Sequence, residues 1–411
     1  MRAVFEKVGS AVLPWRFVLG RGAEVAMDCP GTRGKTQVDL AFVLPALWGG
    51  GVERVYLDLA KRFVQEGFCV DLVLAKAEGP MLPLVPPGVR VIDLNVPRRL
   101  RLVRALLPLE RYFRSVAPRV VIPVMDYLDY LPLWAAWKAG LPTLWVLHNM
   151  PEYLLDVSGA KRWVSLWAAR KALRESLSRA KARVGAVSRG VAEAFAHFAE
   201  VKVERIRVLP NSIDVDRVRS LSQEALNDLP FGKEEPFLVA VGRLHPQKGF
   251  DLLLRAFALL KKRGFVRLPY LLFLGEGPLR LPLESLAKEL DIRDRVFFLG
   301  HVRNPYAYLS RSAGLVVSSR YEGLPTVVLE ALALGVPVVA AHAKGGLLEA
   351  MANGRMGILC PRTPEGLAWG IERLLMEGFC VEKAQVEEHL ERYSPKTAFR
   401  AYLSLLEELW E

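Results

Sequence analysis

The sequence predicts an α/β fold made of two domains, each with a parallel β-sheet covered by helices on both faces. Short runs rich in Val, Leu and Ala alternate with amphipathic helical segments along the chain, as buried parallel strands and their crossover helices require. The 411 residues, of which 52% are hydrophobic, suffice for two cores of ordinary size. No stretch reaches the roughly 18 uninterrupted apolar residues of a membrane-spanning helix.

The chain divides into four predicted segments. Residues 1–36 lack the strand and helix pattern, and we expect them to form a poorly ordered or peripheral leader. Residues 37–210 form the first domain, and residues 211–392 form the second. A last amphipathic helix is predicted within residues 393–411.

The first domain begins with a glycine run between a strand and a helix. The predicted strand spans 39–44, the glycines occupy 49–51, and the helix spans 52–65 before Gly67. Glycines let the backbone approach a ligand that any Cβ would block. Since neither a dinucleotide fingerprint nor a P-loop is present, the run indicates either a ligand-facing loop or a plain flexible turn.

His148 follows a second predicted strand of this domain, residues 143–147. Ligands of α/β sheets bind outside the carboxyl ends of the strands, which favours a functional role for this histidine. A lone histidine can also be a hydrogen-bonded structural group. Both interpretations stay open on the residues alone.

The second domain opens with a strand at 238–242 and a helix at 250–262. The loop between them carries Arg243 and Lys248. Two cations at the carboxyl end of a parallel strand suit a pyrophosphate that gains charge as its substituent leaves. The alternative is a pair of ordinary surface charges around a turn.

A further strand, turn and helix in this domain carry two carboxylates, Glu322 and Glu330. The strand is predicted at 313–318, and residues 323–326 open the helix. Unpaired amides and the helix dipole at such an N-terminus favour an anion such as a diphosphate. Carboxylates beside it suit sugar or ribose hydroxyls, so the pattern predicts a pocket for a nucleotide joined to a sugar. A capped helix with Glu330 in solvent is the alternative.

These motifs resemble the retaining glycosyltransferase family 4, also called glycosyl transferases group 1. The resemblance rests on Glu322-x7-Glu330 with Gly-Leu-Pro after the first glutamate, and it covers nearly everything after residue 37. It implies the GT-B fold, in which two Rossmann-like domains face each other across a cleft and the last helix crosses back to the first domain. The implied donor-binding residues are Gly50, Gly51, Arg243, Lys248, Val302, Asn304, Gly323, Leu324, Pro325, Thr326 and Glu330.

The resemblance also implies roles for individual residues. Arg243 and Lys248 would hold the diphosphate, and Glu330 would hold the ribose. Glu322 and His148 would be the catalytic residues beside the transferred sugar. The implied reaction is a front-face attack in which the leaving phosphate helps to deprotonate the acceptor.

The implied function is a retaining glycosyltransferase that moves a hexose or N-acetylhexosamine from a nucleotide diphosphate sugar, commonly UDP-linked. The acceptor would be a glycan or a lipid-linked molecule in surface polysaccharide or glycolipid synthesis. A same-fold epimerase or phosphorylase is the alternative. No cofactor or metal is implied, and the D-x-D triplet at residues 214–216 is better interpreted as a helix N-cap at Asp214 or Asp216.

The four cysteines give a prediction about location. Cys29, Cys69, Cys360 and Cys380 are too far apart in the sequence for metal-ligand spacing. Four scattered thiols suit a reducing compartment, so we expect a cytoplasmic protein.

The net charge of +12 resides in two segments of the first domain. Residues 98–119 hold seven arginines against one acid, and residues 161–183 hold eight cations against one acid. One interpretation is core-packed helices with solvated basic faces. The other is a basic, Trp-bearing face that lies on anionic lipid at the inner membrane surface. A nucleic-acid-binding protein is a third class, but no recognition motif supports it and we expect no nucleic-acid partner.

Overall fold

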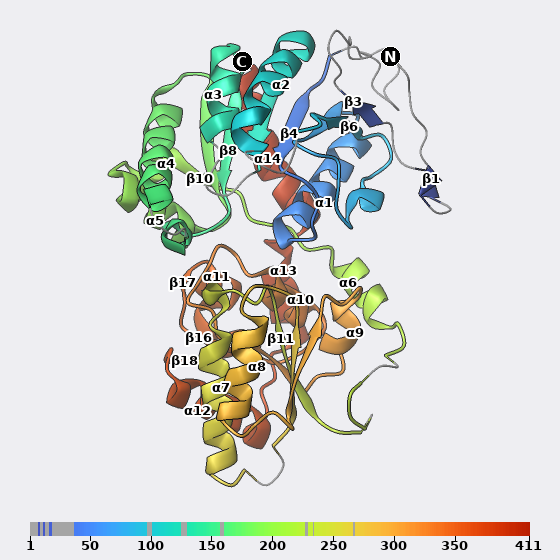
Figure 1. The fold of residues 1–411 in the computed structure, drawn as a ribbon, viewed down its shortest axis with the longest axis vertical. Helices are drawn as coiled ribbons and strands as arrows, with labels where there is room; N and C mark the ends of the chain where they lie inside the picture. The colour runs from blue at the N-terminus through green and yellow to red at the C-terminus, as the bar shows by residue number, and fades with distance from the viewer. Residues whose placement is uncertain are drawn as a thin grey trace. The chain divides into compact units, whose positions relative to one another are not determined.

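The computed structural model describes residues 7–8, 11–12, 16–18, 37–96, 101–124, 130–156, 160–226, 229–232, 234–265 and 268–411 (Figure 1). The chain forms two compact units. The N-terminal unit consists of Met1–Val187, Val191–Asn211 and Pro395–Glu411. The C-terminal unit consists of Ser188–Gly190 and Ser212–Ser394.

An eight-stranded sheet forms the centre of the N-terminal unit, with the order β10-β9-β8-β7-β4-β5-β6-β3 and parallel pairing throughout. Its strands are β3 Arg16–Val18, β4 Leu40–Leu44, β5 Val70–Leu74, β6 Arg90–Asp93, β7 Val120–Pro123, β8 Thr143–Leu147, β9 Ala182–Ala186 and β10 Ile206–Val208. Every residue of β4, β5 and β8 is buried, as expected for strands covered on both faces.

Helices follow the strands of this unit in the chain. They are α1 Gly51–Gln65, α2 Arg101–Val116, α3 Tyr130–Lys138, α4 Ala160–Ser178, α5 Arg189–Ala199 and α14 Pro395–Trp410, with short 3-10 turns η1 Leu82–Leu84, η2 Pro151–Asp156 and η3 Val203–Arg205. The last helix, α14, packs on α1, where the rings of Phe63 and Phe399 lie 4.9 Å apart. Arg183 also binds Glu408 of α14 at 2.9 Å.

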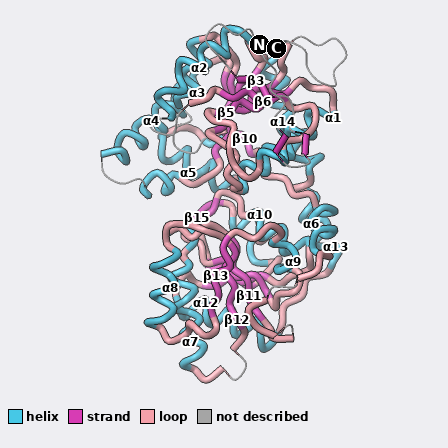
Figure 2. The backbone as a smooth tube through the Cα atoms, turned by 45° about the vertical axis from the view of Figure 1, so that its right-hand side comes forward, coloured by secondary structure: helices cyan, strands magenta, loops and turns pink. Residues whose placement is uncertain are grey.

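A six-stranded parallel sheet forms the centre of the C-terminal unit, with the order β13-β12-β11-β14-β16-β18. Its strands are β11 Phe237–Val241, β12 Tyr270–Leu274, β13 Val296–Gly300, β14 Gly314–Val317, β16 Val338–Ala341 and β18 Ile358–Cys360. Two short strands, β15 Tyr321–Glu322 and β17 Lys344–Gly345, pair in parallel beside it. Figure 2 shows the strands of each unit gathered at its centre with helices outside them.

The helices of the C-terminal unit form two groups. Helices α7, α8 and α12 pack together, and α6, α9, α10 and α13 make a second group on the other side of the sheet (Figure 1). Their bounds, with the remaining turns, are α6 Val215–Ser222, η4 Pro246–Lys248, α7 Phe250–Lys262, α8 Arg280–Glu289, α9 Pro305–Leu309, α10 Thr326–Ala333, α11 Leu347–Ala350, η5 Ala352–Gly354, α12 Pro364–Glu377 and α13 Lys383–Glu391. The predicted class, two domains with parallel sheets covered by helices, is confirmed.

The predicted leader, residues 1–36, lies largely outside the described residues. The structure describes three pieces of it. Strands β1 Lys7–Val8 and β2 Ala11–Val12 pair with each other, and β3 pairs in parallel with β6 at the edge of the N-terminal sheet.

The expectation of four free thiols is wrong for Cys69, which is disulfide-bonded. Spacing along the chain does not tell which cysteines approach each other in space. Cys360 and Cys380 are free thiols, and burial raises the pKa of Cys360 to about 12. Disulfides are rare in reducing compartments, so the disulfide at Cys69 removes the support that four free thiols would have given to a cytoplasmic location. No helix in the described ranges is long and apolar enough to cross a membrane.

Candidate functional site

A buried ion pair lies in the C-terminal unit, beyond the carboxyl ends of β11 and β14. The Glu322 side chain accepts hydrogen bonds through Oε1 from Lys248 Nζ at 2.7 Å and from Ser319 Oγ at 2.5 Å. Glu322 is only 5% exposed. Lys248 ends η4 after β11, and Glu322 ends β15 after β14, so neighbouring parallel strands bring both residues to one edge of the sheet.

Glycines allow the two loops to approach so closely. Gly249 has a φ of 61°, and a Cβ there would lie 2.2 Å from the backbone oxygen of Ser318. Gly242 has a φ of 148°, and its Cβ would lie 2.9 Å from Cε of Lys248. The Ser318 hydroxyl also donates to the Lys248 carbonyl at 2.8 Å. The position of the lysine therefore depends on residues without a side chain at 242 and 249.

The Glu322 carboxylate keeps hydrogen-bonding capacity for a ligand. A carboxylate offers about four lone-pair sites, and Oε1 already takes two donors. Within the described residues, Oε2 of Glu322 has no hydrogen-bond partner. The group is thus held in place by one oxygen while the other can accept from hydroxyls.

The predicted anion loop follows Glu322 directly. Gly323, Leu324 and Pro325 are buried, and Thr326 begins α10. The Gly323 carbonyl accepts from the Ser188 hydroxyl at 2.7 Å and from the Gly346 amide at 3.0 Å. This turn is therefore fixed by contacts within the C-terminal unit.

The residues predicted near the ribose and the base lie around α9 and α10. Glu330 is partly exposed on α10, where the Tyr306 hydroxyl lies 3.4 Å from its Oε1. Asn304 caps α9, since its Oδ1 accepts from the Tyr306 amide at 3.0 Å and its Nδ2 donates to the Leu221 carbonyl at 2.7 Å. Val302 packs against an apolar cluster on the sheet. The contacts show how Asn304 anchors α9, and its contact with a base stays a prediction.

Arg243 is exposed in the loop after β11 that also carries Lys248. The same loop is held by the Leu244 amide, which donates to the Glu276 carbonyl at 2.9 Å. The structure thus places both predicted cations in one loop, with only Lys248 bonded to Glu322.

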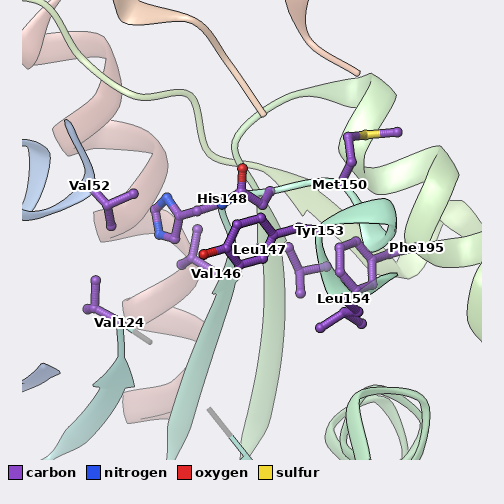
Figure 3. Close-up of a pocket in the computed structure, with 10 residues that line it drawn as sticks. Val52, Val124, Val146, Leu147, His148, Met150, Tyr153, Leu154 and Phe195 are labelled. Atoms are coloured by element: carbon purple, nitrogen blue, oxygen red, sulfur yellow. The ribbon is translucent and has the colours of Figure 1, made fainter. Parts of the chain in front are cut away.

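His148 lies in the N-terminal unit, directly after β8, and lines a pocket (Figure 3). Most of the other lining side chains are apolar, and they come from β8 and the segments around it; they include Val52, Val124, Val146, Leu147, Met150, Leu154 and Phe195. Tyr153 and Asn149 add polar groups. The Nδ1 atom of His148 is buried and has no hydrogen-bond partner among the residues that the structure describes.

Tyr56 contacts the His148 ring, and the Tyr56 hydroxyl in turn lies near the hydroxyl of Tyr402. The Tyr56 hydroxyl lies 3.0 Å from Nε2 of His148 and 3.5 Å from the Tyr402 hydroxyl. Burial lowers the pKa of His148 to about 3, so the ring is neutral at physiological pH. Neither tyrosine belongs to a motif, and no signal in the sequence points to them.

The glycine loop of this unit differs in detail from the expectation. Gly50 is the N-cap of α1 with an ordinary negative φ, and Gly51 has open space around its Cα. Gly49 instead has the positive φ, at 105°. The positive φ thus lies at Gly49, while a Cβ at Gly50 would collide with the Glu53 carboxylate and only Gly51 leaves open space at the helix N-terminus.

The acidic triplet 214–216 forms a helix cap. Asp214 is the N-cap of α6, and its Oδ1 accepts from the Arg217 amide at 3.0 Å, which confirms the N-cap interpretation. In the part of the chain that the structure describes, no group of three or more His, Cys, Asp or Glu side chains could hold a metal ion.

Two family models match the chain. "Glycosyl transferases group 1" matches residues 222–396, and "Glycosyltransferase Family 4" matches residues 49–217. The motifs around Lys248 and Glu322 fall within the first match, and His148 falls within the second.

Two curated relatives show the range of the similarity. An N-acetylgalactosamine-N,N'-diacetylbacillosaminyl-diphospho-undecaprenol 4-alpha-N-acetylgalactosaminyltransferase of Campylobacter jejuni is 33% identical over 172 residues, 42% of this chain and 44% of that protein. The lipopolysaccharide core biosynthesis glycosyltransferase LpsE of Rhizobium meliloti is 28% identical over 363 residues, 87% of this chain and 96% of that protein. The first relatives by similarity are matched over about two fifths of their own length.

The fold is shared with solved structures. The crystal structure of Anabaena Alr3699/HepE in complex with UDP has a TM-score of 0.69 and 21% identity, covering 90% of this chain and 100% of that one. This likeness confirms the predicted GT-B fold class. With the two matched models covering both units, the chain belongs to the glycosyltransferase family 4 with its glycosyl transferases group 1 domain.

Proposed function

We propose that this protein is a retaining glycosyltransferase that transfers a hexose or N-acetylhexosamine from a UDP-linked sugar to a lipid-linked or glycan acceptor. The observation that carries the proposal is the buried Lys248–Glu322 pair at the family's signature positions. It combines a fixed cation for a diphosphate with a carboxylate oxygen that can accept from sugar hydroxyls.

The donor proposal is supported by a structural relative. HepE, which shares the fold, has been solved with UDP and with UDP-glucose. In this chain Lys248 and Arg243 would hold the diphosphate, Glu330 the ribose and Glu322 the sugar. No cofactor is proposed.

The proposed sugar transfer needs no protein nucleophile. The bond between the anomeric carbon and the diphosphate oxygen breaks, and the acceptor oxygen bonds to that carbon on the same face. The acceptor proton passes to an oxygen of the leaving diphosphate. Lys248 stabilises the negative charge that the diphosphate gains, because a preorganised cation needs no reorganisation during the reaction.

A lipid-linked acceptor is supported by the relatives' names. The Campylobacter relative is named for a diphospho-undecaprenol substrate, and LpsE is named for lipopolysaccharide core biosynthesis. An acceptor of this kind lies at a membrane surface, so the proposed enzyme would work there.

Helix α4 offers a surface for such a membrane. Its inner face packs through buried residues such as Ala172 and Leu173, whereas Trp163 and Trp167 are 74% and 63% exposed. Trp163 and Trp167 are one helical turn apart, and Lys171 lies a turn further with its ammonium 5.0 Å from the Trp167 ring centre. Exposed tryptophans beside cations suit the interface of an anionic bilayer.

The catalytic proposal is tested with paired substitutions. Lys248→Met and Glu322→Gln are made singly and together, with Lys288→Ala of α8 as an exposed lysine control. If Lys248 and Glu322 only stabilise the fold, each single variant loses activity because it leaves one charge buried without its partner. The double variant buries no unpaired charge and would then regain activity. We expect less than a hundredth of wild-type transfer in all three variants and full transfer in the control, with the product anomer retained. Restored transfer in the double variant, or an inverted product, would contradict the proposal.

The membrane proposal is tested by vesicle co-sedimentation. Trp163→Ala with Trp167→Ala should lose binding to anionic vesicles, while Trp369→Ala, a 45% exposed tryptophan of α12, should not. Wild-type binding should weaken as salt rises and be absent with neutral lipid. Equal binding to neutral and anionic vesicles, or no effect of the double substitution, would contradict a role of α4.

A further inference from the structure

The η4 turn is bonded through its backbone to the segment that follows β14. Its three consecutive carbonyl groups all accept hydrogen bonds from that segment. The Pro246 carbonyl accepts from the Arg320 guanidinium, and the Gln247 carbonyl accepts from the Arg320 amide at 2.7 Å. The Lys248 carbonyl accepts from the Ser318 hydroxyl at 2.8 Å. Arg320 therefore supplies two of the three donors that hold this turn.

The Arg320 side chain also connects the turn to helix α7. Its Nη2 donates to Oδ2 of Asp251, in the first turn of α7, at 2.8 Å. The Arg320 carbonyl in turn accepts from Nη1 of Arg362, which follows β18, at 2.7 Å. Arg320 is thus bonded at its guanidinium, its amide and its carbonyl, and all of these contacts lie within the C-terminal unit.

The two side-chain acceptors favour an arginine over a lysine. A planar guanidinium presents several N–H groups in fixed directions, so one side chain can donate to a backbone carbonyl and to a carboxylate together. A lysine offers a single nitrogen for both. The Arg320 and Asp251 side chains are 41% and 42% exposed, so their charge attraction alone contributes little to stability. The contact with Pro246 is therefore a matter of geometry more than of charge.

We propose that the Arg320 guanidinium is a positioning group, which fixes the η4 backbone so that the Lys248 ammonium stays beside Glu322 and in place for the donor diphosphate. The inference rests on the proposed function for the role of Lys248. Arg320 acts through the backbone of η4, and no contact with the sugar or the phosphates is assigned to it. Exact placement matters, because a displacement of about 1 Å can lower a rate by about a hundredfold.

Hydrogen exchange measured by mass spectrometry tests the contact without any substrate. The Lys248 and Gly249 amides donate to the His245 and Pro246 carbonyls at 3.0 and 3.2 Å, so a peptide that covers η4 reports how firmly the turn is held. Arg320→Gln removes both side-chain bonds of the arginine and should raise the exchange rate of this peptide about tenfold. Peptides from the β-strands of the same unit should exchange as in the wild type.

Two further variants separate geometry from charge. Arg263→Gln is the matched control, because Arg263 pairs with Glu372 at 3.3 Å and the two side chains are 46% and 42% exposed, close to the values of the Arg320 pair. It should leave the exchange of η4 unchanged. Arg320→Lys keeps the positive charge beside Asp251 but not the two directed donors, so its η4 peptide should exchange nearly as fast as that of Arg320→Gln.

A double-mutant cycle tests the consequence for catalysis. Arg320→Gln should lower kcat/KM by about tenfold to a hundredfold, mainly through kcat, because Lys248 is assigned to charge that develops in the transition state. In a Lys248→Met background the same substitution should change the residual transfer by roughly twofold at most, since the ammonium that it positions is gone. A residue that only stabilises the fold would lower transfer by the same factor in both backgrounds.

Three results would overturn the inference. They are unchanged η4 exchange in Arg320→Gln, wild-type exchange in Arg320→Lys, and an equal loss of transfer with and without Lys248. Faster η4 exchange in Arg320→Gln together with no sugar transfer by the wild type would instead contradict the proposed function. The contact between Arg320 and η4 would then stand on the exchange data alone.

Discussion

Gly249 is the residue on which the geometry of the Lys248–Glu322 pair depends most directly. An alanine there would place its Cβ 2.2 Å from the Ser318 oxygen and would also have to adopt a φ of 61°. Gly264 has a similar φ of 70°, but a Cβ added there would meet no atom within 4 Å, so it is the matched control.

We predict that Gly249→Ala destabilises the C-terminal unit well beyond Gly264→Ala. Gly264→Ala should lower the free energy of unfolding by about 1 kcal/mol, because alanine is strained in the left-handed backbone conformation. Gly249→Ala should lower it further, because the clash with Ser318 also displaces the loop. Urea unfolding of both variants measures the difference, and UDP binding should weaken only in Gly249→Ala. Equal unfolding free energies would show that the loop relaxes without cost.

The pKa of His148 predicts a pH dependence of stability. Its pKa is about 3 in the folded protein and near 6.5 in the unfolded chain. Between these values the unfolded chain binds a proton that the folded protein does not, so stability present above pH 6.5 is lost as the pH falls toward 3. The contribution approaches about 1.4 kcal/mol per pH unit within that window.

The check is the unfolding free energy of the wild type and of His148→Gln between pH 7 and pH 4.5. The variant should show the shallower decline, because glutamine does not titrate. Parallel curves for the two proteins would mean that the His148 ring is not held neutral by burial.

At the scale of single residues, the sequence was sufficient to predict those site residues that belong to a local motif. Lys248 and Glu322 could be predicted because each follows a strand in a recognisable pattern, and the fold brings them within 2.7 Å. Tyr56 and Tyr402 could not, since a tyrosine 346 positions from its partner carries no periodic or motif signal. Gly49 was missed because the φ of each residue in a glycine run cannot be assigned from composition.

At the scale of elements, hydrophobic periodicity was sufficient to predict the bounds of some strands and helices that have a buried side. The predicted strand 143–147 and helix 250–262 match β8 and α7 to the residue. The two-residue strands β15 and β17 could not be predicted, because their pairing depends on tertiary contact between loops. One of them positions Glu322, so the least predictable element carries a central residue of the candidate site.

Helix α14 should be required for the N-terminal unit to fold. It buries Phe399, Leu405, Leu406 and Leu409, and the hydroxyl of its Tyr402 lies 3.5 Å from that of Tyr56 on α1. A chain that ends at Ser394 would leave the facing surface of α1, including Phe63, in water, at about 25 cal/mol for each Å² of apolar area.

We therefore predict that truncation after Ser394 makes the N-terminal unit open to proteolysis, whereas removal of Glu411 alone, an exposed terminal residue, does not. Limited proteolysis with mass spectrometry of the fragments measures this. If the truncated chain resists cleavage as well as the full chain does, the N-terminal unit folds without α14, and the prediction is wrong.

At the scale of the whole molecule, the residues of the two proposed tasks, donor binding and membrane contact, lie in separate units. The charge excess lies in segments 98–119 and 161–183 of the N-terminal unit, which also holds the His148 pocket. The C-terminal unit holds the ion pair and the family's signature carboxylates. A donor that binds the C-terminal unit should therefore raise the stability of that unit, while lipid should act through the other.

The last prediction concerns which donor the whole protein selects. Nucleotide that binds only the folded C-terminal unit stabilises it by about 2.7 kcal/mol at a concentration one hundred times Kd. Thermal unfolding with UDP, GDP and ADP sugars at equal concentration should show the largest rise with a UDP sugar. The Lys248→Met/Glu322→Gln protein should lose that rise, and Lys288→Ala should keep it, because the proposed site holds the diphosphate with Lys248, which is bonded to Glu322. A rise with a GDP sugar alone would make the uridine assignment wrong, and an equal rise in the double variant would move the nucleotide away from Lys248.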